Sequence, residues 1–90
     1  MNFAIHVEIQ SLETIADPEG LTIERALPAL GFSSVHSVRV GKVLRFLLEA
    51  TDEAAARTEV EEMCARLLAN PVIERAEIAI APATEVGGSR

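Results

Sequence analysis

A stretch in the middle of the chain, residues 38–46, constrains the fold more than any other. Apolar and charged side chains alternate on both sides of the pair Gly41-Lys42. Alternation with a period of two is typical of a half-buried strand, and here it occurs twice, separated by two residues. A glycine at the first loop position permits the positive φ that a type II′ turn requires. The sequence therefore predicts a central β-hairpin that turns at Gly41 and Lys42.

Each side of this hairpin is predicted to supply one further strand. Residues 3–10 alternate strictly between apolar and polar or small side chains, which favours a strand with one buried face. Residues 72–81 show the same alternation and are followed by Pro82, which ends a strand because it has no N–H for the ladder.

Two helices are predicted between these strands. The first begins at Asp17-Pro18, a capping residue followed by a proline at the first helical position, and Gly31 suits its C-terminus. Pro28 should kink this helix or tighten its last turn. The second helix begins after Thr51-Asp52 and carries a broad apolar stripe, and Asn70-Pro71 ends it, with asparagine tolerating a left-handed cap.

The element order is therefore βαββαβ, which predicts a ferredoxin-like α+β fold. We expect a four-stranded, mainly antiparallel sheet with both helices on one face. Residues 1–82 should form a single domain, and residues 83–90, with two adjacent glycines, a flexible tail. The sheet face without helices should be partly apolar, which suggests a second subunit. Its expected residues are Ala4, Val43, Leu47 and Ala79.

Composition excludes several classes of protein. A net charge of −6 and a pI near 4.8 argue against binding to nucleic acid or to an anionic membrane. No apolar run approaches the length of a membrane span, and the N-terminus does not resemble a secretory signal. A single cysteine, Cys64, cannot form an internal disulfide, so a cytoplasmic location is expected.

The chain offers little for catalysis. His6 and His36 belong to different predicted elements, and no spacing of His, Cys, Asp or Glu matches a metal site. Cys64 falls on the buried stripe of the second helix, where a nucleophile would lack access. The pair Gly41-Lys42 lacks the upstream glycine and the following Ser or Thr of a phosphate-binding loop. The residues themselves therefore favour a small non-catalytic domain that associates.

Several segments resemble the PurS family, the small subunit of phosphoribosylformylglycinamidine synthase in purine biosynthesis. The resemblance covers roughly residues 3–80, although residues 11–16 lack the Lys-Pro-Gly character common before the Asp-Pro in this family, and the C-terminal tail is longer than usual. The matching segments are Asp17-Pro18-Glu19-Gly20 with Ile23-Glu24-Arg25-Ala26-Leu27, then Leu30-Gly31-Phe32, then Val38-Arg39-Val40-Gly41-Lys42, and finally residues 61–74.

The resemblance implies an adaptor role. In this family the small subunit associates with itself, so we expect a homodimer or a dimer of dimers. It also associates with a glutaminase subunit and an ATP-using synthetase subunit, and it supports ammonia transfer between them. The resemblance implies no catalytic residue, metal or cofactor in this chain; ATP, Mg and glutamine would be used by the partners, and the isolated chain would be inactive. We expect the partner interface to include Asp17 and Glu19 at the first helix start, with Arg39, Gly41 and Lys42 at the hairpin.

Two other functions remain open at this point. A regulatory domain of the ACT type shares the βαββαβ order and binds amino acids at a dimer interface. The first loop, residues 12–16, contains no glycine, which disfavours that interpretation. A small dimeric enzyme would need a histidine or an acid in a pocket, and His6 is its only candidate.

Overall fold

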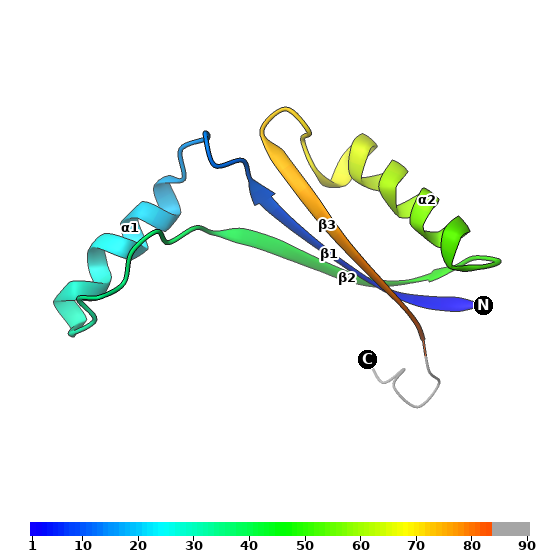
Figure 1. Ribbon diagram of the computed structural model, residues 1–90, viewed down its shortest axis with the longest axis horizontal. Helices are drawn as coiled ribbons and strands as arrows, with labels where there is room; N and C mark the ends of the chain where they lie inside the picture. The colour runs from blue at the N-terminus through cyan, green and yellow to red at the C-terminus, as the bar shows by residue number, and fades with distance from the viewer. Residues whose placement is uncertain (84–90) are drawn as a thin grey trace.

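The computed structural model describes residues 1–83 as an elongated molecule (Figure 1). Its principal extents are 50 × 33 × 16 Å, and its radius of gyration is 16.8 Å. A compact domain of this length would have a radius of gyration of about 12 Å. The elements in chain order are β1 (Asn2–Ser11), α1 (Pro18–Ala26), the 3-10 helix η1 (Leu27–Leu30), β2 (Gly41–Glu49), α2 (Glu53–Met63), the π-helical turn η2 (Cys64–Leu68) and β3 (Glu74–Pro82).

The described residues form a three-stranded antiparallel sheet in the order β2-β1-β3. In the centre of the ladder Ile5 lies opposite Phe46 on β2 and Ile80 on β3. The alternation predicted for residues 3–10 is confirmed, since every second side chain of β1 is buried against α2 and its polar neighbours face away. The buried side chains are Phe3, Ile5, Val7 and Ile9.

The predicted four-stranded sheet is wrong, because residues 38–40 form no strand in the described part of the chain. Backbone N–H groups of this segment donate to carboxylates of the first helical region and not to a neighbouring strand. Val38 donates to Glu24 at 3.0 Å, and Val40 donates to Asp17 at 2.7 Å. These side-chain acceptors replace the ladder bonds that a hairpin would have made.

Gly41 is therefore the first residue of β2 and not a turn residue. Among the described glycines only Gly31 has a positive φ, and Gly41 lies opposite Gln10 in the ladder. A Cβ atom on Gly41 would lie 2.7 Å from the carbonyl oxygen of Ile9. Gly41, which suggested a II′ turn, thus permits the close approach of two strands. A close backbone approach is a second physical reason for a glycine in a strand.

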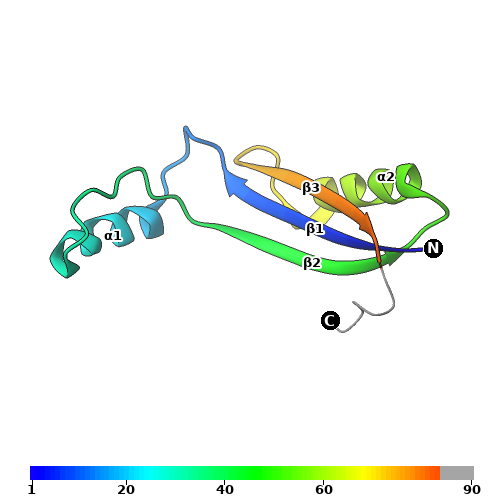
Figure 2. The same cartoon turned by 60° about the horizontal axis from the view of Figure 1, so that its bottom comes forward.

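The predicted placement of both helices on one sheet face is also wrong. Figures 1 and 2 show α2 packed along the β3 side of the sheet, whereas α1 lies beyond the end of the sheet. Buried Ala56, Val60 and Cys64 of the α2 region complete the core with β1. The side chains of β2 that point to the same side are only half-buried; these are Leu44, Phe46 and Leu48.

The helix boundaries follow the predicted capping residues at most positions. Asp17 caps α1, η1 tightens the end of that helix at Pro28, and Gly31 has the left-handed φ of 101°. Asp52 caps α2 through the N–H of Ala55 at 2.7 Å. The predicted left-handed cap at Asn70 is not found, because extended Ala69 ends the helical region after its π-helical turn.

The predicted tail, residues 83–90, lies outside the described residues except for Ala83. No described helix has the length and hydropathy needed to span a membrane.

Candidate functional site

Residues 18–37 form an arm that projects from one end of the sheet (Figure 1). Its helical part carries Ile23, Leu27 and Leu30 at i, i+4 and i+7, the spacing of one apolar helix face, but this stripe covers no part of the sheet in the same chain. Leu30 is 70% exposed and Phe32 is 56% exposed. The exposed large apolar residues of the arm are Leu21, Ile23, Leu30, Phe32 and Val35. An apolar surface of this extent on a chain of this size indicates a site for association.

The carboxylate of Asp17 holds the base of the arm together. Its Oδ1 accepts the N–H of Gly20 at 2.9 Å, and its Oδ2 accepts the N–H of Val40 at 2.7 Å. The Arg39 Nε lies 3.9 Å from the same Oδ2. The hydrogen bond from Val40, then that from Gly20, and then the charge of Arg39 lower the pKa of Asp17 below its ordinary 3.8, although desolvation partly opposes them.

Arg39 extends this connection to the loop that leaves β1. Its Nη2 donates to the carbonyl oxygens of Leu12 at 3.0 Å and Ile15 at 3.1 Å. One side chain therefore joins the segment entering the arm to the segment leaving it. We call Asp17, Arg39 and their hydrogen bonds the Asp17–Arg39 latch.

Gly20 lets α1 approach the returning segment closely. It is buried, and a Cβ atom on it would lie 2.6 Å from the Val38 carbonyl oxygen and 2.9 Å from Asp17 Oδ2. Glu24, one turn further along the same helix, accepts the N–H of Val38 at 3.0 Å. Sequence reasoning assigned neither residue to a site. Their spacing from Asp17, at i+3 and i+7, was the available signal, because it aligns them on one helix face.

The five residues expected at a partner interface have different positions. Asp17 and Arg39 contact each other in the latch. Gly41 and Lys42 begin β2, where Lys42 is exposed and lies opposite Ile9. Glu19 is exposed in the first turn of α1. Lys42 and Arg39 also line a shallow groove at the end of the sheet, together with Glu8, Gln10, Glu13 and Arg75. Contact of any of these residues with a partner stays a prediction.

The sheet offers further apolar surface on both sides. On the face away from α2, the expected residues Ala4, Val43, Leu47 and Ala79 are all exposed, with Leu47 at 57%. On the α2 side, three side chains of β2 pack against the edge of the core but stay only half-buried, and α2 lies over the β3 side of the sheet. We call that second area the open half-sheet, formed by Leu44, Phe46 and Leu48.

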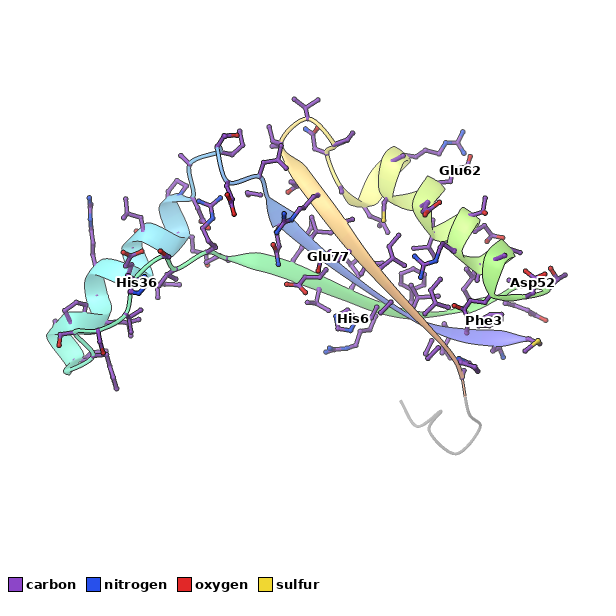
Figure 3. The ribbon with its side chains drawn as sticks, in the orientation of Figure 1. Phe3, His6, His36, Asp52, Glu62 and Glu77 are labelled. Atoms are coloured by element: carbon purple, nitrogen blue, oxygen red, sulfur yellow. The ribbon has the colours of Figure 1, made fainter. Side chains whose placement is uncertain are left out.

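The candidate catalytic residues are dispersed. His6 lies on β1 and His36 on the arm, well apart from each other (Figure 3). Cys64 is buried in the core, and burial, followed by the nearby charge of Glu61, raises the pKa of its thiol. Within residues 1–83 no three His, Cys, Asp or Glu side chains gather as a metal site would require.

Comparison with known proteins gives a consistent result. The family model PurS, described as phosphoribosylformylglycinamidine (FGAM) synthase, matches residues 4–82. The chain is 45% identical over 74 residues to the phosphoribosylformylglycinamidine synthase subunit PurS of Methanocaldococcus jannaschii, covering 82% of this chain and 89% of that protein. It is 35% identical over 72 residues to the PurS subunit of Bacillus subtilis, covering 80% and 84%.

Solved structures agree with the sequence relatives. The crystal structure of M. jannaschii PurS, one of the subunits of formylglycinamide ribonucleotide amidotransferase in the purine biosynthetic pathway, superposes with a TM-score of 0.82 at 39% identity, covering 91% of this chain and 99% of that chain. A chain in the structure of PurLQS from Thermotoga maritima superposes with a TM-score of 0.83 at 32% identity, covering 90% and 99%. This chain therefore belongs to the PurS family of phosphoribosylformylglycinamidine synthase subunits.

Proposed function

We propose that this chain is the assembly subunit of a glutamine- and ATP-dependent synthase that converts formylglycinamide ribonucleotide to the amidine. The apolar arm, which covers no part of the sheet in its own chain, is the observation that carries this proposal. The PurLQS structure from T. maritima supports it, since a chain with this fold occurs there together with PurL and PurQ. In this role the chain brings a glutaminase subunit and a synthetase subunit together and supports ammonia transfer between them.

The chemistry would then belong to the partners. ATP, Mg and glutamine would bind to the larger subunits, and the isolated chain would be inactive. The dispersed His6 and His36 and the buried Cys64 support this division of labour. A cytoplasmic location is favoured by the biosynthetic role of the homologous subunits.

We also propose that the chain acts as a homodimer, in which the arm of one copy packs on the open half-sheet of the other. The surface area supports this arrangement. The chain exposes 6505 Å², whereas a compact monomer of the same mass exposes about 5,100 Å². This excess is larger than the roughly 800 Å² that each partner buries in a standard interface. Arm and open half-sheet are both apolar, so each can cover the other.

Sedimentation equilibrium tests the homodimer directly. Leu30→Glu places a charge in the arm stripe and should shift the protein from dimer to monomer. Leu67→Glu is the matched control, since Leu67 is 83% exposed and lies in η2, away from the arm. It should leave the mass unchanged. A wild-type protein that stays monomeric at every concentration would exclude the homodimer.

Reconstitution tests the assembly role. PurL and PurQ subunits with glutamine and ATP should form the amidine only when this chain is added, and the chain alone should form none. Lys42→Glu should weaken capture of both partners while leaving thermal unfolding unchanged, because Lys42 is exposed. Full glutamine-dependent activity without this chain would contradict the assembly role, and unchanged capture by Lys42→Glu would remove that residue from the interface.

A further inference from the structure

The arm is joined to the rest of the molecule by two crossings of the chain and by a small set of polar contacts. Residues 12–17 enter the arm, and residues 38–41 leave it. The buried core of the described residues lies between the sheet and α2, and it includes no residue of the arm. The direction of the arm relative to the sheet therefore depends on the contacts at these two crossings.

The Asp17–Arg39 latch supplies most of those contacts. Asp17 joins the start of α1 to Val40, the residue that precedes β2. Arg39 joins the same exit segment to the carbonyl oxygens of Leu12 and Ile15, which follow β1. A planar guanidinium that binds two carbonyl groups beside a carboxylate is a geometrically specific connection, which a flexible ammonium group would not reproduce.

We propose that the Asp17–Arg39 latch pre-organises the arm for association, so that the latch sets the affinity between two copies without being needed for the fold of the sheet. This inference rests on the homodimer proposed above. An arm held in one direction presents its apolar stripe with little loss of conformational entropy on binding, whereas a free arm must be ordered when the partner arrives. The latch lies outside the core, so its loss should release the arm as a local unit.

Arg39→Ala is the test variant, and Arg45→Ala is its matched control. Arg45 is an exposed arginine in β2 that lies opposite His6, away from the latch. We expect Arg39→Ala to raise the dimer dissociation constant by about tenfold or more in sedimentation equilibrium, with less than about a twofold change for Arg45→Ala. Arg39→Lys should give an intermediate loss. Hydrogen exchange should show faster exchange at Val40 and unchanged protection in β1.

A double-mutant cycle tests whether Asp17 and Arg39 act as one connection or contribute to association independently. Asp17→Ala combined with Arg39→Ala should weaken association little more than the stronger single variant, because both remove the same connection. Fully additive losses would contradict a single latch.

The remaining outcomes also decide between the proposals. Unchanged dimer affinity in Arg39→Ala, with faster exchange at Val40, would overturn the latch and leave the homodimer in place. Protection lost in β1 as much as in the arm would also overturn it, because Arg39 would then support the whole fold. A wild-type monomer at every concentration would exclude the homodimer itself.

Discussion

The substitution Gly20→Ala tests how closely α1 packs against the segment that leaves the arm. The added Cβ would lie 2.6 Å from the Val38 carbonyl oxygen and 2.9 Å from Asp17 Oδ2. Carbon–oxygen contacts normally begin at about 3.3 Å, so the backbone at Val38 must move by roughly 0.7 Å. That movement would stretch the hydrogen bond from Val40 to Asp17, which is 2.7 Å long.

The expected result is a net loss of local stability. Overpacking of this kind costs about 1–3 kcal/mol. Replacing glycine by alanine within a helix returns about 0.5–1 kcal/mol. The arm should therefore lose about 0.5–2 kcal/mol of local opening free energy, which corresponds to roughly twofold to thirtyfold faster exchange. Native-state hydrogen exchange at the Val38 and Val40 N–H groups measures this change directly.

Gly31→Ala is the contrasting glycine substitution in the same arm. A Cβ atom added there would meet nothing within 4 Å, but the residue has a φ of 101°. Its penalty, about 1–2 kcal/mol, should come from the backbone alone and should stay at the end of η1. Unchanged or slower exchange at Val38 and Val40 in Gly20→Ala would refute the argument that close packing holds this segment. Equally faster exchange at Val38 and Val40 in Gly31→Ala would refute the argument that the effect is local to the contact of Gly20.

Four further outcomes are expected. Hydrogen bonds and Arg39 lower the pKa of Asp17 in the folded protein, so its contribution to stability should be complete above pH 3.8. This contribution should be lost as the pH falls through the lower folded-state pKa, and an NMR titration of the Val40 N–H can follow the loss. Gly41→Ala should destabilise the fold by about 1–3 kcal/mol in chemical denaturation, because its Cβ would meet a β1 carbonyl oxygen. Ile5→Val should cost about 1 kcal/mol by the same measurement, since it removes one buried methylene. The Cys64 thiol should react slowly with a disulfide reagent in the native protein and rapidly in denaturant, because it is buried and its pKa is raised.

The sequence was sufficient where local chemistry decides the structure. Strict alternation in residues 3–10 identified β1 and its buried face. Asp17 and the pair Thr51-Asp52 identified both helix starts, and of that pair Asp52 is the cap, because an N-cap carboxylate acts on N–H groups only a few residues away. Pro28 correctly indicated a tightened helix end, which the structure shows as η1.

The prediction of a central hairpin failed because one glycine is compatible with two physical demands. A positive φ and a close backbone approach both select glycine, and alternation alone does not distinguish them. The deciding contacts come from Asp17 and Glu24, more than ten residues upstream, whose carboxylates take the N–H groups of Val40 and Val38. Acceptors so far away in the sequence do not change the alternation of side chains in residues 38–40, so the pattern of that segment cannot reveal them.

The arm shows a second limit, which bears on its function. The spacing of Ile23, Leu27 and Leu30 correctly indicates an apolar helix face, but amphipathicity states only that a face will be covered, not by which chain. In a self-contained domain both helices would cover the sheet, and the half-buried Leu44 and Phe46 would be shielded by α1. Here α1 points away and leaves two complementary apolar surfaces on one molecule. The sequence pattern predicts a complete core, but a single chain does not assemble one. An exchange of arms between two copies would produce this combination.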